Sequence, residues 1–184
     1  MEPGELVEVL AVSRIGRTFN QYRESALRRS RLAAYLETRS DAPLLLVGEA
    51  AGYRGARVSG IPFTSERQLT GVGPAEATAT IVHRVLAELR LEELTLLWNV
   101  VPTHPGTATS NRRPTRAEVE AAESFLREVV RGRRVVAVGR LAEAVTGAPY
   151  VRHPAHGGAR AFAEAMRHAA TIRRRRTDVR RIDE

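Results

Sequence analysis

The sequence contains no cysteine and no lysine. Without cysteine there can be no disulfide, no thiolate nucleophile and no iron–sulfur cluster or zinc ion held by cysteine. Without lysine, Schiff-base chemistry is left only to the N-terminal amine. No apolar run approaches the roughly 20 residues that a membrane-spanning helix needs, and the first residues lack the apolar segment of a signal peptide. We therefore expect a cytoplasmic protein with no membrane partner.

The basic residues are all arginines. There are 29 of them against 21 acidic residues, which gives a formal net charge of +8. Arginine stays charged at physiological pH and its planar guanidinium matches phosphate oxygens, so this excess is typical of nucleic-acid binding. A GC-rich genome is an alternative explanation for the missing lysines, because its codons favour arginine. It does not explain the net excess of positive charge.

The hydrophobic periodicity predicts alternating helices and strands. Helical spacing is found over residues 21–38, 75–91, 115–130, 141–145 and 158–172, and short apolar runs predict strands at 44–47, 95–101, 134–138 and 149–152. Thr115 and Glu118 have the spacing of a capping box at the start of one of these helices. Strands separated by helices favour a single-domain three-layer α/β/α fold around a central four-stranded parallel sheet.

We expect one domain over residues 1–184, without an internal repeat. Residues 1–40 are predicted to form an N-terminal helical segment, and residues 173–184 a basic tail outside the fold. The segments 52–74 and 102–114 are rich in glycine, proline and small polar residues. They are predicted to be long loops, which in compact domains are commonly functional.

Three of the predicted strands end in turn-forming and polar residues. The run Leu44–Val47 leads into Gly48–Gly52, Leu96–Trp98 leads into Asn99, and the last strand leads into His153. The carboxyl ends of parallel strands meet at one edge of a sheet, where ligands bind. We therefore expect one composite site built from these three ends. The Gly48–Gly52 turn alone is weak evidence, because it has the spacing of neither a Walker loop nor a GxGxxG fingerprint.

The order and spacing of these blocks resemble the microbial uracil-DNA glycosylases, in particular the branch that carries an iron–sulfur cluster. Gly48–Gly52, followed by Gly60–Phe63, is similar to the Gly-Glu-Ala-Pro-Gly and Gly-Arg-Pro-Phe motifs of that branch. Trp98–Val101 resembles its Thr-Asn-Val-Val strand, and Asn111–Pro114 its Asn-Arg-x-Pro segment. His153–Ala155 resembles the second superfamily motif, usually His-Pro-Ser.

The chain departs from the family pattern at several positions. The cysteines that ligate the cluster are absent, so the resemblance implies a cluster-free branch with neither cofactor nor metal. Ala51 stands where the first motif has proline, and Ala155 where the second has serine. Ala50 occupies the position of the water-activating aspartate of the best-known branch, so that general base is missing. Gly52 stands where another branch has a tyrosine that excludes the methyl group of thymine.

The resemblance implies a division of roles at the composite site. A base must be extruded from DNA before its N-glycosidic bond can be cleaved, and Phe63 would stack on the flipped ring. The Asn99 amide offers a donor and an acceptor, which match O4 and N3–H of uracil. A donor from His153 would stabilise charge at O2 of the leaving base, which is typically worth ~3 kcal/mol. Glu49 is the remaining candidate for positioning water or steadying the sugar cation.

The remaining motif residues are expected around the base or along the DNA. Base contacts are expected from Gly48, Ala50, Gly52 and Tyr53, and DNA contacts from Arg112, Arg113, Ala155, His156, Gly157 and Gly158. The last four would form a loop that inserts into the duplex, where the wedge residue is commonly apolar, so a histidine is a departure. Each proposed catalytic residue also has a structural explanation: a core position for Phe63, an internal hydrogen bond for Asn99, a strand cap for His153 and a loop brace for Glu49.

The sequence thus predicts a monofunctional DNA glycosylase that removes uracil and leaves an abasic site. Its partner would be uracil-containing DNA, double- or single-stranded, and the protein would be a nucleoid-associated monomer in the cytoplasm. Two alternatives stay open. One is a damage-recognising DNA-binding protein with little catalysis, favoured by Ala50, and the other is a nucleoside or nucleotide hydrolase on a similar sheet. Hypoxanthine, xanthine and mismatched thymine are further possible targets.

Overall fold

The computed structural model describes residues 1–155 and 157–180, and it contains one central sheet. The strands are β1 (Leu44–Ala50), β2 (Thr95–Val101), β3 (Arg134–Val138) and β4 (Tyr150–Val151). They pair in the order β2-β1-β3-β4, and every pairing is parallel. The predicted four-stranded parallel sheet is therefore confirmed. All four carboxyl ends lie at the same edge of it.

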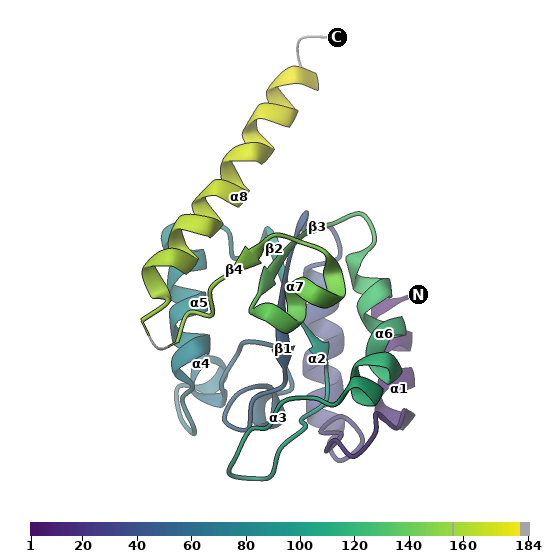
Figure 1. Cartoon of the computed structure of the whole chain (residues 1–184). Helices are drawn as coiled ribbons and strands as arrows, with labels where there is room; N and C mark the ends of the chain where they lie inside the picture. The colour runs from purple at the N-terminus through teal and green to yellow at the C-terminus, as the bar shows by residue number, and fades with distance from the viewer. Residues whose placement is uncertain (156, 181–184) are drawn as a thin grey trace.

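Helices cover both faces of the sheet (Figure 1). The described helices are α1 (Pro3–Val12), α2 (Ala26–Thr38), α3 (Ala56–Ser59), α4 (Glu66–Thr70), α5 (Ala77–Glu88), α6 (Arg116–Val130), α7 (Arg140–Thr146) and α8 (Ala159–Arg180). Side chains of α1, α2, α6 and α7 pack with Leu45 and Val47 of β1, whereas those of α5 and α8 pack with Leu44 and Leu46. Because successive strand residues point to opposite faces, this alternation produces the predicted three layers. No helix in the described part of the chain is long and apolar enough to cross a membrane.

The start of α6 carries the predicted capping box. The Thr115 hydroxyl accepts a hydrogen bond from the Glu118 amide, and the Glu118 carboxylate accepts one from the Thr115 amide. The buried Glu118 side chain also pairs with both terminal nitrogens of Arg112, at 2.6 and 2.8 Å. These bonds to Arg112, with the amides of Thr115 and Arg17, lower the pKa of Glu118 to about 2. Glu118 therefore joins the N-terminal segment to the loop that precedes α6.

The N-terminal segment and the first long loop differ in part from the prediction, whereas residues 102–114 contain no helix or strand, as predicted. The helix expected over residues 21–38 begins at Ala26, because the Ser25 hydroxyl caps it by accepting a hydrogen bond from the Arg28 amide. Gln21 and Tyr22, which were expected at the start of this helix, are fully buried in irregular structure instead. The segment 52–74 contains α3 and α4, so the prediction of a continuous loop was wrong.

The last helix is longer than predicted. It was expected to end at residue 172, but α8 continues to Arg180. The predicted basic tail, residues 173–184, therefore coincides in part with this helix. The side chains of Arg173–Arg176 and the whole of residues 181–184 lie outside the described part of the structure.

Candidate active site

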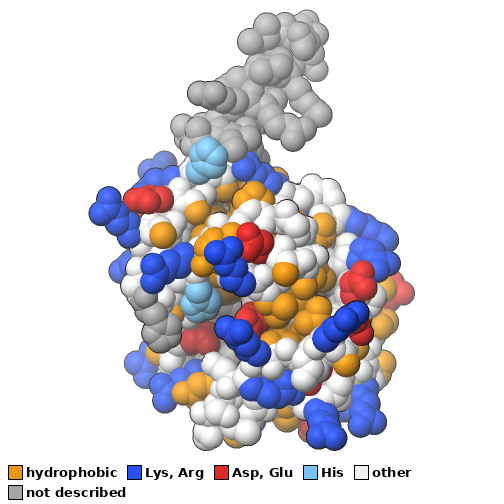
Figure 2. Space-filling model, in the orientation of Figure 1, with side chains coloured by type: hydrophobic (Ala, Val, Ile, Leu, Met, Phe, Trp, Pro, Cys, Tyr) orange, Lys and Arg blue, Asp and Glu red, His pale blue; other side chains and the backbone are white. Residues whose placement is uncertain are grey.

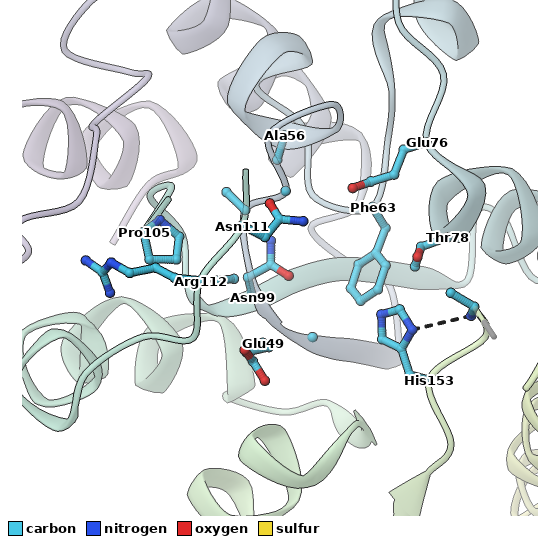
Figure 3. Close-up of a pocket in the computed structure, with 15 residues that line it drawn as sticks. Glu49, Ala56, Phe63, Glu76, Thr78, Asn99, Pro105, Asn111, Arg112 and His153 are labelled. Atoms are coloured by element: carbon cyan, nitrogen blue, oxygen red, sulfur yellow. Dashed lines mark hydrogen bonds between the residues drawn. The ribbon is translucent and has the colours of Figure 1, made fainter. Parts of the chain in front are cut away.

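A cavity of about 310 Å³ opens at the carboxyl edge of the sheet. It is lined by residues from all three predicted blocks, among them Gly48, Glu49, Ala50, Gly52, Asn99 and His153, together with Phe63. Figure 3 shows Phe63, Asn99 and His153 lying near one another although they come from separate segments of the chain. The structure therefore brings together the strand ends that the sequence indicated as one composite site.

Asn99 and Gly48 form the floor of this cavity. They are paired neighbours on β2 and β1, and Asn99 is only 4% exposed. A Cβ atom at Gly48 would lie 2.8 Å from Oδ1 of Asn99 and would collide with the ring of Phe63. Glycine at this position therefore keeps open the space between the amide and the ring. Among the described residues the Asn99 side chain has no hydrogen-bond partner, so a buried amide faces the cavity unpaired.

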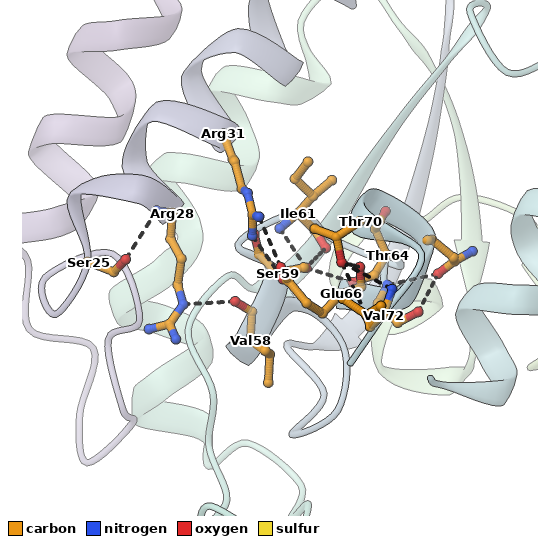
Figure 4. Close-up of polar contacts among 12 residues, drawn as sticks. Ser25, Arg28, Arg31, Val58, Ser59, Ile61, Thr64, Glu66, Thr70 and Val72 are labelled. Atoms are coloured by element: carbon orange, nitrogen blue, oxygen red, sulfur yellow. Dashed lines mark hydrogen bonds and ion pairs between the residues drawn. The ribbon is translucent and has the colours of Figure 1, made fainter. Parts of the chain in front are cut away.

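The loop that carries Phe63 is held by contacts to the N-terminal segment (Figure 4). Arg31 of α2 makes two bonds to the Glu66 carboxylate, at 2.9 and 3.0 Å, and Arg28 donates to the Val58 carbonyl. The buried Tyr22 hydroxyl donates to the Gly60 carbonyl at 3.0 Å. These contacts support a backbone that is strained at Phe63 itself, where φ is +52°. The ring is thereby fixed against the cavity.

His153 reaches the cavity from the segment that follows β4. Its Nδ1 atom accepts a hydrogen bond from the Ala155 amide at 3.3 Å (Figure 3). Because Nδ1 accepts, the proton of a neutral imidazole lies on Nε2. The turn also depends on Gly158, since a Cβ atom there would collide with the His153 carbonyl oxygen. The segment after β4 therefore sets both the position and the tautomer of the ring.

Glu49 lines the cavity on a different side from Phe63 and Glu76. Strand alternation places its side chain on the face opposite to Gly48, and it is half-buried. Figure 3 shows its carboxylate turned away from Phe63 and from Glu76. Glu49 therefore lines the cavity without facing the Asn99 amide across it.

The buried side chain of His104 holds the backbone of the first motif, Gly48–Gly52. The two ring nitrogens of His104 each lie 2.7 Å from a carbonyl oxygen, one of Ala51 and one of Thr107. The side-chain oxygen of Asn111 accepts a hydrogen bond from the Tyr53 amide at 2.9 Å. Tyr53 is half-buried, but it is not among the residues that line the cavity.

The predicted DNA-contacting residues are distributed unevenly. Arg112 and Ala155 line the cavity, and the Arg112 guanidinium is already paired with Glu118. Arg113 and Gly157 are exposed, whereas Gly158 is buried and His156 lies outside the described residues. Figure 2 shows the molecule in the orientation of Figure 1. On the face that it shows, arginine side chains are spread out with apolar surface between them.

Sequence reasoning missed one charged residue of the cavity. Glu76 precedes α5 and lines the wall beside Gly52, and burial raises its pKa. An acidic residue before a helix is ordinarily explained by the helix dipole, so no signal in the sequence pointed to the cavity. Among the described residues no group of three or more acidic or histidine side chains could hold a metal ion.

Comparisons with known proteins agree with this arrangement. The sequence profile described as the uracil DNA glycosylase superfamily matches residues 36–180. The crystal structure of wild-type SMUG2 from Pedobacter heparinus is similar with a TM-score of 0.69 and 14% identity, covering 95% of this chain and 99% of that one. No curated protein matches the sequence significantly. At such low identity the structural likeness speaks for the fold alone, but the profile covers most of the chain. The chain therefore belongs to the uracil DNA glycosylase superfamily.

Proposed function

We propose that this protein removes uracil from DNA by hydrolysing its N-glycosidic bond, leaving an abasic site. Membership of the superfamily supports a DNA glycosylase, and the choice of uracil rests on Asn99. Its amide is buried, faces the cavity and has no partner among the described residues. The donor and the acceptor of this amide are therefore both available to a ligand that enters the cavity.

The chemistry of uracil fits this amide. Uracil presents N3–H as a donor and O4 as an acceptor, which a single amide in one orientation can match. Cytosine presents an acceptor at N3 and a donor at its amino group, so the same orientation rejects it. The Phe63 ring, close to the Asn99 oxygen across Gly48, offers an apolar face on which a flipped base can stack.

Leaving-group stabilisation is assigned to His153. As the glycosidic bond breaks, the electron pair passes to the base and negative charge develops at O2. The Nε2–H donor of a neutral His153 would stabilise this charge more than it stabilises the substrate, which is the condition for catalysis. Water then attacks C1′ and gives the abasic sugar. Glu49 is assigned to positioning this water or steadying positive charge on the sugar, in place of the aspartate that Ala50 replaces.

The remaining assignments concern the DNA. Exposed Arg113 and the turn at Ala155–Gly158 would contact the phosphate backbone and the space left by the flipped base, in single- or double-stranded substrate. Arg112 would have to exchange part of its pairing with Glu118 to do so. We further propose that the protein acts as a monomer on chromosomal DNA in the cytoplasm.

A base-release assay tests the proposal. Matched oligonucleotides containing uracil, hypoxanthine, xanthine or a mismatched thymine are incubated with excess protein, and the abasic product is cleaved by alkali and quantified. Release of uracil, faster than of the other bases, is expected. Binding to uracil-containing DNA without release would favour a damage-recognising protein. Activity on free deoxyuridine alone would favour a nucleoside hydrolase.

A further inference from the structure

Glu76 forms part of the cavity wall. Its carboxyl group occupies space that side chains at Gly52 and Gly55 would fill. A Cβ atom at Gly52 would collide with Oε1 of Glu76, and one at Gly55 would lie 2.9 Å from its Cδ atom. The carboxyl group therefore packs directly on the turn that follows β1. Gly52 and Glu76 both line the cavity with Asn99, Phe63 and His153. In Figure 3 the Glu76 side chain reaches in from the segment before α5.

This carboxyl group has no evident structural use. Glu76 is the N-cap residue of α5, but its side chain makes no capping hydrogen bond. Glutamate is also a poor choice for this position, where serine, threonine, aspartate and asparagine are preferred. Among the described residues no ion pair or hydrogen bond to its carboxyl oxygens is found. Glu76 is half-buried, so its carboxyl group is partly removed from water without gaining a protein partner, and a ligand in the cavity can supply that partner.

We propose that Glu76 is a specificity residue of the cavity: its carboxyl group hydrogen-bonds the bound base, and in the acid form it donates to a carbonyl oxygen of that base. The cavity would thereby prefer a keto oxygen to an amino group at this edge, in addition to the preference set by Asn99. The inference rests on the proposed function, because the bound base is taken to be uracil. It assigns to Glu76 the binding of the base, not the cleavage of the bond.

The protonated form is favoured by the surroundings of Glu76. Burial raises its pKa, and no neighbouring charge is a cause of the shift. The other titratable or charged groups around the cavity are Glu49 at the end of β1, Arg112 before α6 and His153 beyond β4. Since the donor is lost on ionisation, the contribution of Glu76 to uracil binding falls as the pH rises through its pKa.

The test compares Glu76→Gln and Glu76→Met with the wild-type protein. Single-turnover release of uracil is measured between about pH 5 and 9, together with binding of otherwise identical uracil- and cytosine-containing strands. Glutamine keeps an N–H donor at every pH, whereas methionine keeps the volume without a donor. The control is Glu88→Gln, which changes an exposed carboxylate on the same helix. Thermal denaturation establishes that each variant is folded.

At the lowest pH of the series, the expected result is a loss of about threefold to tenfold in kcat/KM for Glu76→Met, the range of one neutral hydrogen bond. Its preference for uracil over cytosine should narrow by the same factor. Glu76→Gln should stay within about twofold of the wild type at low pH and lack the alkaline decline that Glu76 causes. Equal uracil release by the wild type and Glu76→Met at every pH would overturn the inference. So would equal losses in both variants with an unchanged pH profile, because Glu76 would then only fill space.

The two hypotheses fail in different ways. If the wild-type protein releases no base from any strand, the proposed function is wrong. The binding measurements then still decide on Glu76, since a wild-type preference for the uracil-containing strand must narrow in Glu76→Met. An unchanged binding preference would contradict the role of Glu76 whether or not the protein is a glycosylase.

Discussion

Replacement of Asn99 should lower activity without destabilising the protein. The side chain is 4% exposed and has no hydrogen-bond partner among the described residues, but its polar atoms border the open cavity and are not sealed from solvent. Asn99→Ala therefore breaks no hydrogen bond within the described part of the chain. It leaves no sealed void, because the side chain already borders an open cavity. We therefore expect the free energy of unfolding to change by less than about 1 kcal/mol.

The same substitution removes two hydrogen bonds to the base. At about 0.5–1.5 kcal/mol each, their loss corresponds to roughly a fivefold to hundredfold decrease in kcat/KM for uracil. Asn99→Asp should also weaken uracil and admit cytosine, because a carboxylate accepts from an amino group but cannot donate to O4. Stability is measured by urea denaturation and activity by single-turnover base release. An Asn99→Ala variant that is clearly destabilised yet fully active would show that the amide is structural.

Three further substitutions test His153, Glu49 and Glu118. His153→Ala should lower the single-turnover rate at least tenfold while binding to uracil-containing DNA changes little, because the donor acts on charge that develops in the transition state; an unchanged rate would remove His153 from the site. Glu49→Gln should lower turnover by about two orders of magnitude if its charge steadies the sugar cation, and full activity would leave leaving-group stabilisation as the main effect. Glu118→Gln should destabilise the protein at neutral pH by on the order of 2 kcal/mol. The pKa of Glu118 is lowered to about 2 in the folded protein, so its carboxylate stabilises the fold at any pH above the usual pKa of glutamate. This stabilisation is lost as the pH falls toward about 2. Urea denaturation at pH 7 and pH 3 should show the difference from the wild type shrinking at the lower pH, and a pH-independent difference would contradict this cause.

Much of the fold could be predicted because local signals agreed with tertiary packing. The apolar runs at 44–47 and 95–101 are buried strands, and the Thr115–Glu118 spacing is a real helix start. The segment before α2 could not be predicted from periodicity. Gln21 and Tyr22 are fully buried through long-range bonds to the carbonyls of Pro102 and Gly60, which a local pattern does not contain.

The site was predictable where it follows from topology. Gly48, Asn99 and His153 end or follow strands, and a parallel sheet brings such residues to one edge. Glu76 could not be found in this way, because its position depends on how the segment before α5 folds back onto Gly52. Tyr53 shows the opposite case: it directly follows the first motif in sequence, yet it is not part of the cavity lining.

A crystal structure with a uracil-containing oligonucleotide would show where the flipped base binds. His153→Ala, which should bind DNA and cleave slowly, is the form to crystallise. We expect a flipped uracil against the Phe63 ring, with O4 and N3 within hydrogen-bond distance of the Asn99 amide. A uracil bound elsewhere on the protein, or left stacked in the DNA with the cavity unoccupied, would contradict it.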